Sequence, residues 1–110
     1  MSTTNQKVCA DPSCCFAKIS LILGDVWNLQ IINQLLQSES VRFSEMTENI
    51  NGLSNSVLSA RLKNLAEQEI IERDTITSVP PQVLYRLTVK GEAMKPIFDQ
   101  ILKSAQSLYS

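Results

Sequence analysis

The sequence predicts a mainly α-helical protein with a small antiparallel β wing, the winged helix-turn-helix fold. A short helical segment, a glycine turn and a longer capped helical segment follow one another over residues 44–67, which is the pattern of a helix-turn-helix. Two segments of alternating apolar and polar residues come next, joined by a Pro-Pro pair, as in a β-hairpin. A long amphipathic segment closes the chain. These features predict one domain over residues 15–110, preceded by a flexible arm at residues 1–14.

The composition fits a single domain and argues against an enzyme. With 110 residues, 44% of them hydrophobic, the chain can bury one core but not two. It contains no His, the commonest general base and a frequent metal ligand. Its three glycines are too few for nucleotide-phosphate loops. We therefore expect a non-enzymatic protein without a cofactor. Because the sequence has neither an apolar run of membrane-spanning length nor a signal peptide, we expect a cytoplasmic location.

Two helices are expected before the helix-turn-helix. The apolar residues of the first recur at helical spacing up to Gly24, which we assign as its C′ residue; they are Phe16, Ile19 and Leu23. Asp25 is a suitable N-cap for the second helix, which should end near Gln37 or Ser38. Trp27 is expected in the core. The apolar face of this second helix is predicted to hold Leu29, Ile32, Leu35 and Leu36.

The helix-turn-helix has local signals at both of its helices. Ser44 is expected to cap the first helix, with Met46 and Ile50 pointing inward, and Gly52 supplies the turn. The N′, N-cap and N4 positions of the second helix hold Leu53, Ser54 and Leu58, the arrangement of a hydrophobic staple. One apolar stripe then contains Leu58, Leu62, Leu65, Ala66 and Ile70, and the other face carries Asn55, Ser56, Ser59, Ala60, Lys63 and Asn64.

The wing is predicted as two strands at residues 70–77 and 83–87. Its tip is formed by residues 78–81, because the prolines there have no N–H to donate to a ladder. Thr88 is expected to be an N-cap, and Pro96 lies early enough to bend or restart the closing helix. That helix carries apolar residues at steps of three and four, namely Met94, Ile97, Phe98, Ile101, Leu102, Ala105 and Leu108.

Small and hydrogen-bonding side chains on the second helix of the motif suit entry into a DNA major groove, which is about 12 Å wide. The net charge of −1 weighs against nucleic acid, but residues 54–64 carry two cations, Arg61 and Lys63, and no acid. The candidate base contacts are Asn55, Ser56, Ser59 and Lys63, with Ser54 and Ala60 beside them, and the candidate phosphate contacts are Arg42, Arg61 and Arg86. On the wing, Arg73, Thr77, Ser78 and Gln82 are candidates for backbone or minor-groove contacts.

Each of these assignments has a plainer alternative. The exposed face of the second helix would then be an ordinary solvated, serine-rich surface. Arg42 would pair with Glu39 or Glu45, and Arg61, which lies near the buried stripe, would be a structural ion-pair partner. The polarity of Thr77, Ser78 and Gln82 would be that of any hairpin.

Several motifs carry a family resemblance. They are the Gly-x-x-Trp of residues 24–27, the RFSE of residues 42–45, the LSxRL of residues 58–62, and PPxVxYxLT of residues 80–88 followed by Gly91. In this combination, over residues 14–102, the chain resembles the HxlR-type winged helix-turn-helix transcriptional regulators, which are related to the MarR group. One departure is Gln82, where the family often has a basic residue; it puts insertion of the wing tip into the minor groove in doubt.

The resemblance implies a homodimer that binds double-stranded DNA and pairs through its first and last helices. An amphipathic closing helix fits that expectation, because its apolar face needs a partner surface. The candidate interface residues are Phe16, Ile19, Leu23, Ile97, Phe98, Ile101, Leu102 and Ala105.

The resemblance also implies a cysteine ahead of the Gly-x-x-Trp motif, and Cys14 falls at that place. Some members use it to sense oxidants or electrophiles. A helix N-terminus lowers a thiol pKa and so favours reactivity, whereas the nearby Asp11 opposes it and a cysteine often packs as a small hydrophobe. Cys9 is a candidate resolving partner. The cluster of Cys9, Cys14 and Cys15 is one ligand short of a closed tetrahedral metal site, so we expect no metal.

The leading hypothesis is therefore a dimeric, sequence-specific DNA-binding regulator, with an oxidant or a small molecule as candidate effector. Its two recognition helices would enter successive major-groove faces about 34 Å apart, so the operator should be a pseudo-palindrome. The rival hypothesis is a winged-helix module that binds protein, as an adaptor or assembly subunit. The acidic balance of the chain supports that rival.

Overall fold

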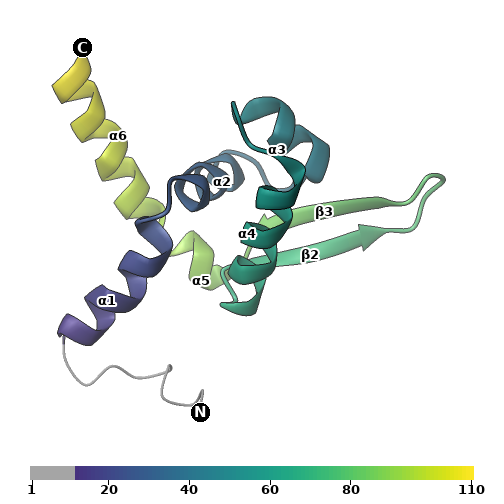
Figure 1. The fold of residues 1–110 in the computed structure, drawn as a ribbon, viewed down its shortest axis with the longest axis horizontal. Helices are drawn as coiled ribbons and strands as arrows, with labels where there is room; N and C mark the ends of the chain where they lie inside the picture. Colours follow the sequence, from purple (N-terminus) through teal and green to yellow (C-terminus); the bar gives the residue numbers. More distant parts are fainter. Residues whose placement is uncertain (1–11) are drawn as a thin grey trace.

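The computed structural model describes residues 12–110 and has the predicted winged helix-turn-helix fold. Helices α1 (Pro12–Leu23) and α6 (Lys95–Tyr109) diverge from one side of the body, and a long β-hairpin extends from the opposite side (Figure 1). The helices between them surround the core. Its buried hydrophobic residues are Ile22, Ile31, Ile32, Leu35, Val41, Met46, Ile50, Leu53, Leu58, Leu62, Leu65, Ile70, Ile71, Leu87, Met94 and Phe98.

Helix α1 begins earlier than the sequence suggested. It starts at Pro12, so residues 12–14, which we assigned to the arm, are helical; proline suits the first helical position because the N–H it lacks would be unpaired there. Gly24 is not the left-handed C′ residue that we expected, since Gly52 is the only glycine of the described chain with a positive φ. Glycine is needed at position 24 for another reason: a Cβ there would lie 2.6 Å from the carbonyl oxygen of Ser20.

Helix α2 (Val26–Leu36) is capped by Asp25, as predicted. Its buried face differs in detail, because Ile31 and Asn28 are buried while Leu29 and Leu36 are only half-buried. Trp27 packs against the core from a half-buried position. Within residues 12–110 no single helix is long and apolar enough to cross a membrane; α1 and α2 would meet that test only together, as a pair bent by 84°.

The helix-turn-helix comprises α3 (Phe43–Asn49) and α4 (Asn55–Glu67). The N-cap of α3 is Arg42 and not Ser44, which lies inside the helix. The expectation was wrong because the chain runs directly from strand β1 (Val41–Arg42) into the helix, and the Glu45 side chain accepts the Arg42 backbone N–H at 2.8 Å. Met46 and Ile50 are buried as predicted, and Gly52 turns the chain at φ 82°.

The wing is a hairpin of β2 (Ile71–Ile76) and β3 (Gln82–Leu87), and β1 adds a short third strand that the sequence did not predict. The antiparallel sheet has the order β1-β3-β2, with Val41 opposite Tyr85 and Ile71 opposite Leu87. After β3, Thr88 caps the short helix α5 (Val89–Glu92), and Pro96 lies in the first turn of α6. The proline therefore restarts a helix, as expected.

Candidate nucleic-acid interface

The outward face of α4 collects small polar side chains at a well-capped helix start. The Ser54 side chain caps α4 by accepting the backbone N–H of Val57 at 3.2 Å. Ser54 and the next two turns present one exposed surface, which we call the α4 face: Ser54, Asn55, Ser56, Ser59, Ala60 and Lys63. A helix start with small side chains can approach base edges closely, because little bulk separates its backbone from the groove floor.

The opposite side of α4 is fixed in the core. Leu58, Leu62 and Leu65 are buried at 0–3% exposure, and Leu53, just before the cap, is buried with them. Ala66, which we placed on the same stripe, is exposed. Because three successive turns of the helix are anchored, a large rotation of α4 would expose apolar surface, and the stripe therefore determines which side of α4 faces outward.

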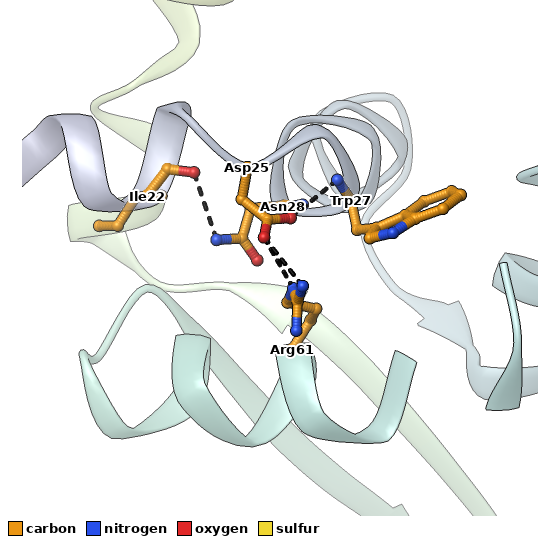
Figure 2. Close-up of polar contacts among 5 residues, drawn as sticks. All are labelled: Ile22, Asp25, Trp27, Asn28 and Arg61. Atoms are coloured by element: carbon orange, nitrogen blue, oxygen red, sulfur yellow. Dashed lines mark hydrogen bonds and ion pairs between the residues drawn. The ribbon is translucent and has the colours of Figure 1, made fainter. Parts of the chain in front are cut away.

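Arg61 does not belong to the α4 face. Two residues advance a helix by about 200°, so Arg61 and Lys63 point in nearly opposite directions. Arg61 turns toward the start of α2, where its Nε and Nη2 lie 3.0 and 2.9 Å from Oδ2 of Asp25 (Figure 2). The structural ion pair that we named as an alternative is thus what the structure has, and the cation that α4 offers to a ligand is Lys63 alone.

The environment of Asp25 favours its ionised form. Burial by itself would raise the pKa of Asp25 and is the largest single effect. It is outweighed by the hydrogen bonds from Arg61 and from the backbone N–H groups of Asn28 and Trp27, together with the Arg61 charge. The pKa of Asp25 therefore lies below its ordinary value, and the ion pair is intact at neutral pH.

Arg42 stands ahead of the motif with an exposed side chain. Its Nε lies 3.9 Å from Oε1 of Glu45, at the outer limit of an ion pair, and both side chains are about half exposed. Such a pair contributes little free energy. Arg42 is consequently available to a phosphate, although it is not free of competition.

The wing is less cationic than its sequence suggests. Arg86 lies directly opposite Glu72 on β2 and is held by two carboxylates, 3.5 Å from Glu72 and 3.1 Å from Asp74. Arg73 is exposed and has no ion pair with the described residues. Thr77 lies at the exposed tip, and Gln82 is half-buried opposite Ile76. Of the candidate wing cations, Arg73 is the one left uncompensated.

The two helices expected to dimerise carry exposed apolar residues. On α1, Phe16 is 73% exposed, whereas Leu23 packs against the core. On α6, Phe98 is buried within the chain at 5% exposure, so it anchors the helix and is not available to a partner, contrary to our expectation. The rest of the α6 face is apolar and open to solvent, and we call this shallow surface the α6 groove; its residues are Pro96, Ile97, Gln100, Ile101, Ser104, Ala105, Leu108 and Tyr109.

The cysteines lie at the start of α1. Cys14 is the third residue of the helix and is half-buried, and Cys15 is exposed. The N-terminal turn of a helix favours a thiolate. Cys9, the candidate resolving residue, lies outside the described residues. Within residues 12–110 no cluster of three His, Cys, Asp or Glu side chains could hold a metal ion.

Two features of this region escaped the sequence analysis. Asn28 was not singled out, although it is 2% exposed and its Nδ2 donates to the carbonyl oxygen of Ile22 at 3.2 Å. Tyr109 was not named either, although it extends the apolar face of α6 beyond Leu108 to the end of the helix, at 87% exposure. The spacing of apolar residues along α6 could have placed Tyr109 on this face; no local pattern marks Asn28, since polar residues are mostly exposed.

Comparison with known proteins gives consistent relatives. The family model of HxlR-like helix-turn-helix proteins matches residues 22–110. The HTH-type transcriptional regulator YodB of Bacillus subtilis is 40% identical over 80 residues, which are 73% of this chain and 70% of YodB. The uncharacterised HTH-type transcriptional regulator YvaP of the same organism is 42% identical over 90 residues, 82% of each protein.

Solved structures agree with these relatives. The reduced form of YodB superposes with a TM-score of 0.74 at 34% identity, covering 93% of this chain and 97% of that one. Diamide-treated YodB has a TM-score of 0.70 at 35% identity and covers 92% and 95% of the two chains. Quinone-bound YodB has a TM-score of 0.73 at 34% identity and covers 88% and 98%.

Proposed function

The chain belongs to the HxlR-like helix-turn-helix family and is a transcriptional regulator of the helix-turn-helix type; from this premise we propose that it works as a homodimer on a pseudo-palindromic DNA operator. The observation that carries the proposal is the α4 face. It combines a capped helix start, small polar side chains and one lysine that has no ion pair within residues 12–110, on a helix whose other side is buried in the core. These are the properties that a helix needs to read base edges in a major groove.

The partner in the dimer is a second copy of the chain, bound along α6 and α1. The apolar groove of α6 continues to the end of the helix, and Ile101 and Leu102 remain about half exposed in the protomer. A two-fold pairing covers the same patch on both copies. It also sets two α4 helices on one side of a duplex, and half-sites about 34 Å apart then follow from the helical repeat of DNA.

The small number of uncompensated cations predicts that the affinity for DNA depends only modestly on salt concentration. Lys63 and Arg73 have no ion pair among residues 12–110, and Arg42 is held only loosely. Two to three such cations in each protomer give a slope of log K against log salt of about −4 to −5. Base contacts and the two-site geometry must therefore supply much of the operator affinity.

A binding titration tests the proposal. Fluorescently labelled genomic fragments are titrated with the protein at several salt concentrations in the presence of excess unrelated DNA, and the tightest fragment is then used with Lys63→Ala. We expect saturable binding, and for the variant a weaker affinity with a slope less steep by about 2, because each dimer loses two cations. Lys103→Ala, on the polar side of α6, is the matched control.

The titration has two adverse outcomes. Equal affinity and equal slope for Lys63→Ala and the parent would refute the assignment of the α4 face. If no fragment is bound at any salt concentration, the DNA proposal fails and the protein-binding alternative takes its place.

We also propose that Cys14 makes DNA binding responsive to oxidants or electrophiles. Its place in the first turn of α1 favours the thiolate, and α1 is one of the two helices that we expect at the dimer interface. The YodB structures support the choice of reagents, since that relative is known in diamide-treated and quinone-bound forms. Diamide or a quinone should alter the DNA affinity of the parent and leave Cys14→Ser unchanged. An equal response of both proteins would disprove the role of Cys14.

A further inference from the structure

We infer that the ion pair between Asp25 and Arg61 positions α4: it sets the orientation of the α4 face relative to the turn at residues 24–25, between α1 and α2. The inference deepens the proposed function, because it assigns to two residues outside the α4 face a part in reading the operator. Neither residue is expected to touch DNA. Both act through the helix that does.

One carboxylate joins two helices here. Oδ1 of Asp25 accepts the backbone N–H groups of Trp27 and Asn28 at 2.9 and 3.1 Å and so caps α2. Oδ2 accepts Nε and Nη2 of Arg61 from α4 at 3.0 and 2.9 Å. Each oxygen serves one helix, and the start of α2 is thereby tied to the middle of α4 across 36 positions of sequence.

Asn28 ties the same point to α1. Its side chain is buried, and Nδ2 donates to the carbonyl oxygen of Ile22, in the last turn of α1, at 3.2 Å. Its Oδ1 is buried without a hydrogen-bond partner among the described residues, and it lies on the Arg61 side of the amide (Figure 2). A continuous series of polar contacts thus leads from α1 through the α2 start to α4.

The ion pair between Asp25 and Arg61 is better suited to hold two helices in a fixed orientation than a fully exposed ion pair would be. The Arg61 and Asp25 side chains are 33% and 28% exposed, so solvent screens them less than it would a fully exposed pair. Because two N–H groups of the planar Arg61 guanidinium donate to the same carboxylate oxygen, the contact restricts the direction of the guanidinium as well as its distance from Asp25.

The position of Arg61 on α4 explains why the contact matters for DNA. Arg61 lies nearly opposite Lys63 around the helix and on the same rigid element. A rotation of α4 about its axis that breaks the ion pair therefore also turns Lys63 and Ser56 away from their positions on the α4 face. The leucine stripe holds α4 in the core but tolerates small rotations, because apolar contacts are not directional. The ion pair supplies the missing directional restraint.

Asp25→Asn and Arg61→Met isolate this contact. Asparagine caps helices about as well as aspartate, so Asp25→Asn keeps the α2 cap and removes only the charge partner of Arg61. Arg61→Met retains most of the apolar stem and removes the guanidinium. Asp99→Asn is the matched control, since it removes an ion pair of similar length, Lys95 to Asp99 at 3.1 Å, from α6.

The measurement compares operator and unrelated duplex across a salt series, with thermal unfolding of each variant recorded beside it. We expect both variants to bind the operator roughly two- to thirtyfold more weakly, the usual range for residues that couple two elements. Affinity for unrelated DNA and the salt slope should not change, because no phosphate contact is lost. The double variant should be no worse than either single variant.

Three results would overturn the inference. Operator affinity unchanged in both variants would show that the contact positions nothing. A smaller salt slope for Arg61→Met would show that Arg61 contacts phosphate itself. An equal loss of operator and unrelated affinity, in step with the fall in thermal stability, would reduce the contact to a purely structural one.

Amide hydrogen exchange separates this inference from the proposed function. If the parent protein binds no DNA at all, the proposed function is wrong, but the positioning of α4 is still measurable. In Asp25→Asn the amides of α4 should then exchange faster relative to those of α6. Unchanged relative protection would refute the inference independently of any DNA.

Discussion

Replacing Ile101 by glutamate should dissociate the proposed dimer. Ile101 is 45% exposed in the protomer and lines the α6 groove. Full burial of an isoleucine side chain contributes about 1.5–3 kcal/mol, so covering its remaining exposed part contributes about 1 kcal/mol. Because a two-fold interface buries the residue twice, the dimer loses about 2 kcal/mol, which raises its dissociation constant about thirtyfold. The carboxylate adds a desolvation cost, so thirtyfold is a lower bound.

Sedimentation velocity over a concentration series measures this effect directly. The matched control is Gln106→Glu, which adds the same charge about 140° away around α6, on its polar side. We expect the control to sediment like the parent, and Ile101→Glu to sediment as a monomer over a concentration range in which the parent is a dimer. Identical association of Ile101→Glu and the parent would refute the assignment of the α6 groove as the interface, and with it the two-site geometry of the operator.

Three further predictions follow from individual contacts. Gly91→Ala should lower the free energy of unfolding by about 1–3 kcal/mol in urea titrations, because its Cβ would collide with a backbone carbonyl just before β2; an unchanged midpoint would contradict the packing of α5. Because Asp25 has a lowered folded-state pKa, its ion pair stabilises the fold above the ordinary Asp pKa of about 3.9, and this stability is lost as the pH falls through the folded-state pKa. The stability gap between the parent and Asp25→Asn should therefore narrow below about pH 4, and a gap that is constant with pH would be the contrary result. Neutralising Glu72 and Asp74 together, as Gln and Asn, should release Arg86 and steepen the salt slope of DNA binding by about 2 for the dimer; a further Arg86→Ala should reverse the gain, and no change in slope would mean that the wing does not reach the phosphates.

The sequence predicted the elements whose signals are local. Asp25, Ser54 and Thr88 are capping residues identified by type and position, and the structure has all three as N-caps. The hairpin was predictable because alternation and a Pro-Pro tip are both short-range patterns. Strand β1 was not, because two residues are too few to show a period of two, and its pairing with β3 joins residues more than 40 positions apart.

The errors at the helix ends have the same origin. Serine is a common N-cap, so Ser44 looked suitable by type; the actual start of α3 is set by β1 pairing with Tyr85 and Leu84, which sequence proximity does not reveal. Gly24 looked like a left-handed helix cap because of its residue type. In the structure a glycine is needed there because a side chain would collide with the carbonyl oxygen of Ser20. Residue type indicates where a chain turns, and the tertiary contacts decide how.

The sequence was sufficient to predict which residues of the candidate site lie on the exposed side of α4, but not which of its cations are neutralised by ion pairs. Periodicity sufficed to place Ser56, Ser59 and Lys63 on the outside of α4, because the leucine stripe fixes the inside. The free charge of the surface depends instead on partners distant in sequence: Arg61 is neutralised by Asp25, 36 positions away, and Arg86 by acids across the hairpin. A count of cations along residues 54–64 therefore gives twice the charge that the α4 face presents.

The same neutralisation bears on how the protein would distinguish its operator from other DNA. Nonspecific affinity comes mainly from phosphate contacts made by cations, and intramolecular carboxylates withhold two of the candidate arginines from that role. Binding to the proposed operator, in contrast, would draw on hydrogen bonds from small side chains and on two α4 faces engaging at once. Ion pairs that lower the nonspecific affinity and leave the operator contacts unchanged raise the ratio of specific to nonspecific binding. This ratio is the quantity that matters when many nonspecific sites compete. An acidic chain is thus compatible with DNA recognition, provided that the protein pairs and that the α4 faces are held at a fixed orientation.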